Sequence, residues 1–268
     1  MTETNIIYAF GLTLLAGLAT GIGSALTIFT KKTNTKVLSV ALGFSAGVMI
    51  YVSMIEIFFK GKAALVSQLG PQKGSWLTVA AFFGGMLVIA VIDKLIPQAG
   101  NPHEMRSVEE MGQENNDQNK LLRMGFVTAL AITVHNFPEG LATFAAAVKD
   151  PALGLPIAFA IAIHNIPEGI AVAIPVYYAT GSRRKAFIYS FISGLSEPLG
   201  ALIGYFLLAS LFNDLTFGLL FALVAGIMVF ISLDELLPAA EEYGEHHLSI
   251  YGVISGMLVM AVSLLLFI

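Results

Sequence analysis

Two six-residue stretches, HNFPEG at 135–140 and HNIPEG at 164–169, place the same polar residues inside two of the most apolar segments of the chain. An ionised side chain at the centre of a membrane helix costs about 2.5–3.5 kcal/mol. A histidine and a glutamate in such surroundings, written twice, therefore indicate a buried functional site.

The composition is that of a polytopic membrane protein. Hydrophobic residues make up 56% of the 268, charged residues 12%, and the mean hydropathy is +0.80, whereas soluble domains carry about 25% charged residues. The N-terminal MTETNIIYAF lacks the basic region and cleavage site of a signal peptide, so we expect the first apolar segment to be retained.

Charge and cysteine content exclude several classes. The sequence has no cysteine, which excludes disulfides, thiolate metal ligands and iron–sulfur chemistry, so any metal must be held by nitrogen and oxygen. The net charge of −4 is scattered and no basic tract is present. Nucleic acid is therefore not an expected partner.

About 20 apolar residues are needed to cross a bilayer as a helix, and polar or Gly/Pro-rich breaks divide the chain into eight such segments. Continuous apolar runs of this length are not typical of barrel strands. We predict an all-α protein with a single transmembrane domain over 1–268 and one long polar connection, at 98–120. The eight predicted spans are 5–29, 37–58, 75–97, 121–147, 153–178, 186–211, 216–239 and 249–268.

Lysine and arginine predict the orientation. The first, third, fifth and seventh loops hold ten of these residues, and the other three loops hold four. Positive residues are enriched in cytoplasmic loops. The odd-numbered loops, including 98–120, are therefore predicted to face the cytoplasm, with both termini outside, in the cell (inner) membrane.

An internal repeat relates the spans. AGVMIYVSMIEI (46–57) matches AGIMVFISLDEL (225–236), GGMLVIAV (84–91) matches SGMLVMAV (255–262), and GLATGIG (17–23) matches GLSEPLG (194–200) more weakly. Spans one to three thus correspond to six to eight, and four to five. Both shifts are odd, so the copies would cross the membrane in opposite directions, a 3+2+3 inverted repeat common in secondary transporters. Chance likeness between apolar helices is the alternative.

The spacing within each motif directs its polar side chains to one helix face. Residues i and i+4 are neighbours on a helix, so His135 should lie beside Glu139, and His164 beside Glu168. The proline of each motif removes one helical hydrogen bond and frees a carbonyl. The final glycine of each motif is expected to let the two helices approach closely.

Two imidazoles and two carboxylates from paired helices could ligate a divalent transition ion. Imidazole suits Zn²⁺ and Fe²⁺, the lack of sulfur argues against Cu⁺, and the histidines argue against Mg²⁺ and Ca²⁺. Glu197, with Asn136, Asn165 and both motif glutamates, could form a second, oxygen-rich position. The alternative is a pair of kinked helices with structural His–Glu contacts.

Other ionisable residues lie outside the two motifs. Asp93 and Asp234 are read as caps near helix ends rather than ligands. Glu56 and Glu235 are repeat partners that either line a pathway or serve packing. The last loop is read as a solvated charged turn, with metal receipt as its alternative; its residues are Glu241, Glu242, Glu245, His246 and His247.

With HNxPEG in both the fourth and fifth of eight spans, essentially the whole chain resembles the ZIP (Zrt/Irt-like) metal transporters, and in particular their bacterial zinc-uptake branch, ZupT. The resemblance implies a binuclear site and a homodimer. It implies zinc at the first position, iron-like ions at the second, and transport into the cytoplasm. Many ZIP proteins carry a histidine-rich loop between the third and fourth spans, whereas this loop has only His103. The implied ligands are His135, Glu139, His164 and Glu168 for one metal, and Asn136, Asn165, Glu197 and the shared glutamates for the other.

These observations together predict a transporter that imports Zn²⁺, with Fe²⁺, Mn²⁺ and Co²⁺ as further substrates, and not an enzyme. No catalytic cofactor is expected, and no P-loop is present, so energy must come from ion gradients or the metal's own gradient. An intramembrane metalloenzyme is the competing hypothesis, although the sequence has no HExxH. A metal-gated channel is the third.

Overall fold

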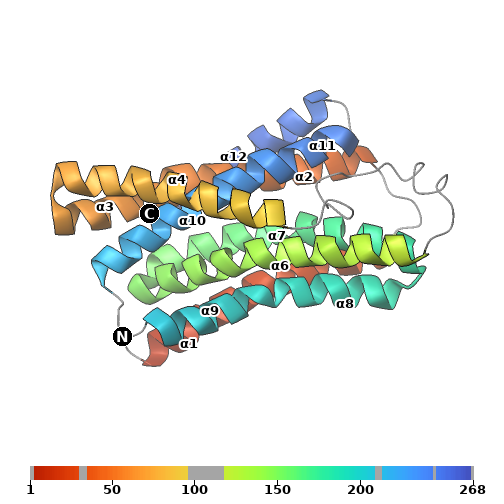
Figure 1. Ribbon diagram of the computed structural model, residues 1–268, viewed down its shortest axis with the longest axis horizontal. Coiled ribbons are helices and arrows are strands. Elements are labelled where there is room, and N and C mark those ends of the chain that lie inside the picture. Colours follow the sequence, from red (N-terminus) through yellow and green to blue (C-terminus); the bar gives the residue numbers. More distant parts are fainter. Residues whose placement is uncertain (1–2, 30–34, 96–117, 209–212, 244–245, 267–268) are drawn as a thin grey trace.

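The computed structural model describes residues 3–29, 35–95, 118–208, 213–243 and 246–266, and every element in these ranges is a helix (Figure 1). Most helices are α-helices; the segments η1 and η3 are π-helices. The elements are α1 (Glu3–Phe29), α2 (Thr35–Tyr51), η1 (Val52–Ile57), α3 (Phe58–Leu69), α4 (Pro71–Leu95), α6 (Gln118–Lys149), α7 (Pro151–Thr180), α8 (Arg183–Gly194), α9 (Ser196–Leu208), α10 (Asp214–Ile231), η3 (Ser232–Leu236), α11 (Leu237–Tyr243) and α12 (His246–Leu266).

Seven helical stretches within the described residues are long and apolar enough to cross a membrane, which confirms a polytopic membrane protein. They correspond to every predicted span except the fourth. The span predicted at 121–147 falls within α6, where the side chains up to residue 132 lie outside the described set. The predicted polar connection at 98–120 also lies outside it, apart from its last three residues, which already belong to α6.

The second span differs from its prediction. Instead of ending at 58, helix continues from Lys36 to Leu69, and Lys60 forms an ion pair with Glu56 one turn earlier, at 3.7 Å. The turn follows at Gly70, whose φ of 80° suits glycine, and Pro71 begins α4. The loop expected at 59–74 is therefore reduced to a tight turn.

The sixth predicted span is present as one apolar stretch, Arg183–Phe206, with a one-residue interruption at Leu195. Helix α8 ends at Gly194 and α9 begins at Ser196. Pro198 has no N–H and cannot donate to the carbonyl of Gly194, four residues earlier, so an unbroken α-helix is disfavoured there. Glu197 consequently lies in the first turn of α9.

The helices form two groups, one above the other in Figure 1. In the lower group α1 and α6 pack against α7, and α9 packs against α6; in the upper group α12 packs against α2, and α10 against α3 and α4. The two groups meet where α2 contacts α7 and α6 contacts α10. At the second junction Lys149 forms an ion pair with Asp214 at 2.7 Å, with its ammonium 4.0 Å from the centre of the Phe217 ring.

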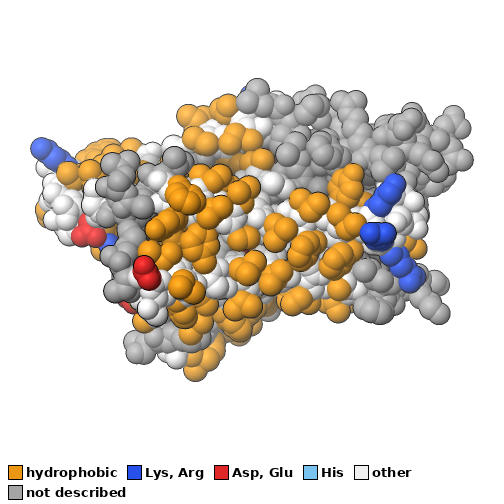
Figure 2. Space-filling view, turned by 90° about the horizontal axis from the view of Figure 1, so that it is seen from below, with side chains coloured by type: hydrophobic (Ala, Val, Ile, Leu, Met, Phe, Trp, Pro, Cys, Tyr) orange, Lys and Arg blue, Asp and Glu red, His pale blue; other side chains and the backbone are white. Residues whose placement is uncertain are grey.

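Figure 2 shows that hydrophobic side chains cover the middle of one face, while charged side chains gather at its two ends. The exposed large side chains in the described residues include Leu15, Phe83, Phe206 and Leu265. A surface of this kind suits hydrocarbon around the middle and water at the ends. This face therefore has the apolar middle and charged ends that are typical of a membrane-spanning surface.

Glycines set the closest helix contacts in the upper group. A Cβ added to Gly226 of α10 would overlap the carbonyl oxygen of Phe82 in α4, and one added to Gly47 of α2 would overlap that of Val253 in α12. Gly47 and Gly226 are partners in the sequence repeat. The helix pairs α2–α12 and α4–α10 thus make equivalent backbone contacts, as small residues permit in membranes.

The lower group contains a second matched pair of contacts. Added Cβ atoms at Gly23 of α1 and Gly200 of α9 would overlap the carbonyl oxygens of Ile166 and Phe137. Both carbonyls belong to the residue before the motif proline. The two glycines are again repeat partners, so α1 meets α7 as α9 meets α6.

The two π-helices occupy corresponding positions. η1 covers 52–57 and η3 covers 232–236, which are matching parts of the two aligned segments 46–57 and 225–236. A π-helix is rare and inserts an extra residue into a helical turn. Its recurrence at one repeat position extends the sequence likeness to the backbone.

Replacing Gly226→Ala should destabilise the protein by about 1–3 kcal/mol, because the new Cβ forces α10 away from α4. Gly84→Ala is the matched control, since a Cβ there meets no heavy atom within 4 Å. Thermal unfolding in detergent, followed by circular dichroism, checks the expected difference. Equal unfolding temperatures for the two variants would contradict the packing described here.

Candidate metal centre

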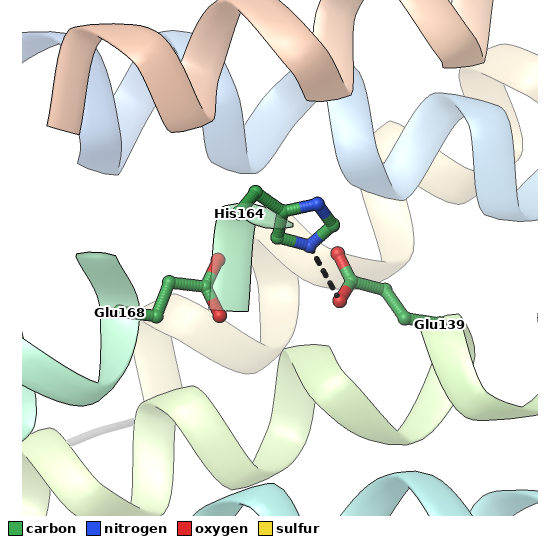
Figure 3. A group of neighbouring side chains, drawn as sticks. All are labelled: Glu139, His164 and Glu168. Atoms are coloured by element: carbon green, nitrogen blue, oxygen red, sulfur yellow. Dashed lines mark hydrogen bonds and ion pairs between the residues drawn. The ribbon is translucent and has the colours of Figure 1, made fainter. Parts of the chain in front are cut away.

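Three side chains from the two motifs converge in the lower group of helices. Glu139 comes from α6, and His164 and Glu168 come from α7. Each offers a ligand atom within 4.8 Å of the others. Figure 3 shows both carboxylates directed toward the imidazole. All three side chains are at most 1% exposed, so the cluster is enclosed by protein.

The imidazole links the two helices. His164 Nε2 lies 3.2 Å from Glu139 Oε2, a contact drawn as a dashed line in Figure 3. His164 and Glu168 lie one turn apart on α7, as the i,i+4 spacing predicts. Among the described residues, Glu139 Oε1 has no hydrogen-bond partner. That oxygen retains its capacity to bind an ion.

An asparagine and the third glutamate form a second polar group. Asn165 Nδ2 donates to Glu197 Oε1 and also to the carbonyl oxygen of Ala16 in α1, the latter at 2.8 Å. With its NH₂ occupied by two acceptors, the side chain presents its oxygen. Within the described part of the chain, Asn165 Oδ1 and Glu197 Oε2 have no hydrogen-bond partner. Both are hard oxygen donors of the kind that bind cations.

The remaining predicted ligands are less fully placed. Asn136 lies on α6 and is fully buried. His135 also belongs to α6, but its side chain lies outside the described residues, so its role as a ligand stays a prediction. The structure thus gathers Glu139, His164 and Glu168 and joins Asn165 to Glu197.

The motif glycines act differently from the expectation. They do not bring the two motif helices together. A Cβ at Gly140 would overlap the backbone of Glu197 in α9, and one at Gly169 would overlap the carbonyl oxygen of Thr20 in α1. Gly140 therefore allows α9 to pack closely against α6, and Gly169 allows α1 to pack closely against α7. The first of these contacts brings the backbone of Glu197 against the α6 motif.

The site buries three carboxylates, which is electrostatically unfavourable unless they are paired or bind a cation. Glu139, Glu168 and Glu197 are each at most 1% exposed. Buried charges of one sign repel one another and lose their hydration, and a buried carboxylate is retained when it is paired or coordinates a metal. A divalent cation at the cluster would satisfy both demands.

Two contacts to the site were not predicted. The carbonyl of Ala16 holds Asn165, and Ser45 Oγ in α2 lies 3.4 Å from the carbonyl oxygen of His164. A backbone acceptor carries no residue signature, so no sequence pattern could reveal Ala16. The serine links α7 to the other helix group and places the site next to the boundary between the groups.

The weaker predictions have mixed outcomes. Asp93 lies in the last turn of α4, as expected, but Asp234 lies within η3 and is exposed, so it does not cap a helix end. Glu56 lies in η1 and pairs with Lys60. In the last loop Glu241 and His247 are exposed, while the side chains of 242–246 lie outside the described residues.

Comparison with known proteins found extensive similarity. The family described as ZIP zinc transporter matches residues 93–264. The chain is 62% identical to the zinc transporter ZupT of Clostridium perfringens, over 98% of this chain and 97% of that protein. It is 64% identical to the ZupT of Streptococcus mutans (98% and 99%) and 65% identical to that of Chlorobaculum parvum (98% of each).

Glu168→Gln should raise the unfolding temperature of metal-free protein, because it replaces one of three buried, clustered carboxyl groups by a neutral amide; about 1 kcal/mol corresponds to 2–4 °C. The same change should shrink the stabilisation that Zn²⁺ produces, which for intact protein is about 2.7 kcal/mol at a concentration 100 times the Kd. Thermal unfolding with chelator and with Zn²⁺ measures both. Glu3→Gln, on the exposed first turn of α1, is the control; an unchanged zinc response in Glu168→Gln would count against a metal centre.

Proposed function

This chain belongs to the ZIP family of zinc transporters, and from that membership we propose that it carries Zn²⁺ across the cell membrane into the cytoplasm. The relatives at 62–65% identity are named zinc transporters and match almost the whole chain. The single structural observation that carries the proposal is the buried Glu139–His164–Glu168 cluster inside a polytopic membrane protein.

The proposed site holds two ions. His135, Glu139, His164 and Glu168 would surround the first. The hydrogen-bonded pair Asn165 and Glu197, with Asn136 and the shared glutamates, would surround the second. The oxygen atoms without partners on Glu139, Asn165 and Glu197 support an oxygen-rich second position. That chemistry fits Fe²⁺, Mn²⁺ and Co²⁺ as further substrates beside Zn²⁺.

The proposed architecture is eight spans in a 3+2+3 inverted repeat. The matched glycine contacts and the matched π-helices support it, because they relate α2 to α10, α4 to α12 and α1 to α9 at the repeat positions. The distribution of lysine and arginine supports cytoplasmic odd loops and extracytoplasmic termini. A homodimer is proposed from the family likeness.

We expect alternating access as the mechanism. Water leaves the ion as carboxylate, imidazole and amide ligands replace it, and relative motion of the two helix groups then opens the other side. The position of the site supports this view, since Ser45 of the upper group touches the backbone of His164 in the lower one. The ion would thus be held close to the surface along which the groups move.

Transport is favoured over catalysis by the comparisons, because the relatives are named transporters. A metalloenzyme would need an open coordination position and a general base acting on a bound water. In the proposed site both motif glutamates bind the ion, so neither is assigned as a general base. The two hypotheses give different results in the following experiment.

Proteoliposomes containing the purified protein should take up ⁶⁵Zn²⁺ with saturation. Uptake should fall to the level of empty liposomes in Glu139→Ala/Glu168→Ala, because the site loses both shared carboxylates. Glu3→Ala should transport like the intact protein, since its side chain is exposed at the start of α1. Zinc binding without uptake, or turnover of a lipid or peptide that depends on Glu139, would overturn the transport proposal.

Uptake should also decrease as the pH falls. Imidazole and carboxylate must be deprotonated to bind a metal, so protons compete with Zn²⁺ and the apparent KM should rise under acidic conditions. Initial rates across a series of external pH values, at fixed free Zn²⁺, measure this. A flat profile through the titration range of histidine and glutamate would contradict the assigned ligands.

A further inference from the structure

Thr20 of α1 occupies the repeat position of the site residue Glu197. GLATGIG at 17–23 aligns with GLSEPLG at 194–200, which pairs these two residues. Their surroundings match as well: the carbonyl of Thr20 abuts Gly169 of one motif, as the backbone of Glu197 abuts Gly140 of the other. Thr20 therefore meets the α7 motif as Glu197 meets the α6 motif.

The hydroxyl of Thr20 departs from the behaviour of other threonines in these helices. A helical threonine commonly donates to the carbonyl four residues earlier. For Thr20 that carbonyl belongs to Ala16, which already accepts the amide of Asn165 at 2.8 Å. Among the described residues Thr20 Oγ1 has no hydrogen-bond partner. Threonines that do make this bond, at 2.7–2.9 Å, are Thr13, Thr78, Thr143 and Thr180.

The hydroxyl is also fully enclosed. Thr20 is 0% exposed, and a Cβ placed on Gly194 would lie 2.9 Å from Thr20 Oγ1. Gly194 is the last residue of α8, directly before the break that leads to Glu197. A buried polar group without a partner destabilises the fold. One turn earlier on α1, the carbonyl of Ala16 holds Asn165, and among the described residues Asn165 Oδ1 and Glu197 Oε2 likewise have no hydrogen-bond partner.

We propose that Thr20 is a further residue of the metal site, and that its hydroxyl hydrogen-bonds to water or carboxylate in the shell of the transported ion. The inference rests on the proposed function. A polar occupant beside α1 would satisfy the hydroxyl and the partnerless oxygens of Asn165 and Glu197 together. Any water that the bound ion keeps would be a natural hydrogen-bond partner for the hydroxyl.

The exchange of carboxylate for hydroxyl between the two repeat positions has a chemical meaning. Glu197 contributes a carboxyl group at its repeat position, whereas Thr20 contributes a neutral hydroxyl at the matching one. Rapid transport requires an ion to be held firmly enough to enter and weakly enough to leave. A hydroxyl adds one hydrogen bond to the shell of the bound ion without placing a fourth carboxyl group beside Glu139, Glu168 and Glu197.

The test compares variants in ⁶⁵Zn²⁺ uptake by proteoliposomes. Thr20→Val removes the hydroxyl at nearly constant shape, and Thr20→Ala removes it with less bulk. One neutral hydrogen bond is worth about 1 kcal/mol, so both should raise the KM for Zn²⁺ about five-fold, while Thr20→Ser, which keeps the hydroxyl, should transport like the intact protein. Thr13→Val is the matched control, because Thr13 is buried in the same helix but donates to Ala9.

The outcomes separate this inference from the proposed function. Absence of uptake by the intact protein would overturn the proposed function and this inference with it. Saturable uptake with an unchanged KM in Thr20→Val and Thr20→Ala would overturn the role of Thr20 alone. The same holds if Thr20→Ser is as impaired as Thr20→Val, or if Thr13→Val raises the KM equally. If Thr20→Val unfolds in detergent, Thr20→Ala and Thr20→Ser decide by the same comparison.

Discussion

The burial of three carboxylates in one small region is the constraint on which the rest of the structure depends. Glu139, Glu168 and Glu197 are buried, in a molecule with hydrophobic side chains across the middle of the face in Figure 2. Such a group requires helices that are packed tightly enough to exclude lipid, and a cation bound among its oxygens stabilises it further. The glycine contacts provide that packing, and the donor set of the motifs is suited to such a cation.

Sequence reasoning predicted the features that depend on composition and helical spacing. The apolar segments were located because crossing a bilayer requires their length, and His164, Glu139 and Glu168 were grouped because charge inside such segments needs a reason. The repeat was visible because its two copies share residue types. None of these inferences requires knowledge of which helices touch.

The remaining features depend on contacts between distant parts of the chain. The helix continues to Leu69 because α3 packs against α4 and α10, and lysines at 60 and 62 disguise that continuation. The partners of Gly140 and Gly169 lie in α9 and α1, which the motif alone does not specify. The carbonyl of Ala16 has no side-chain signature at all. Each of these follows from tertiary packing, which periodicity does not encode.

The junction of Lys149 with Asp214 and Phe217 contrasts with the interlocked glycine contacts inside each helix group. Both charged side chains there are substantially solvent-accessible, at 34% and 48%, and an exposed ion pair contributes about 0–1 kcal/mol. That free energy is comparable to thermal energy, so the ion pair between Lys149 and Asp214 breaks and re-forms readily. Dissolved salt also screens it, which makes the ease of separating the two groups at this end sensitive to the ionic composition of the surrounding medium.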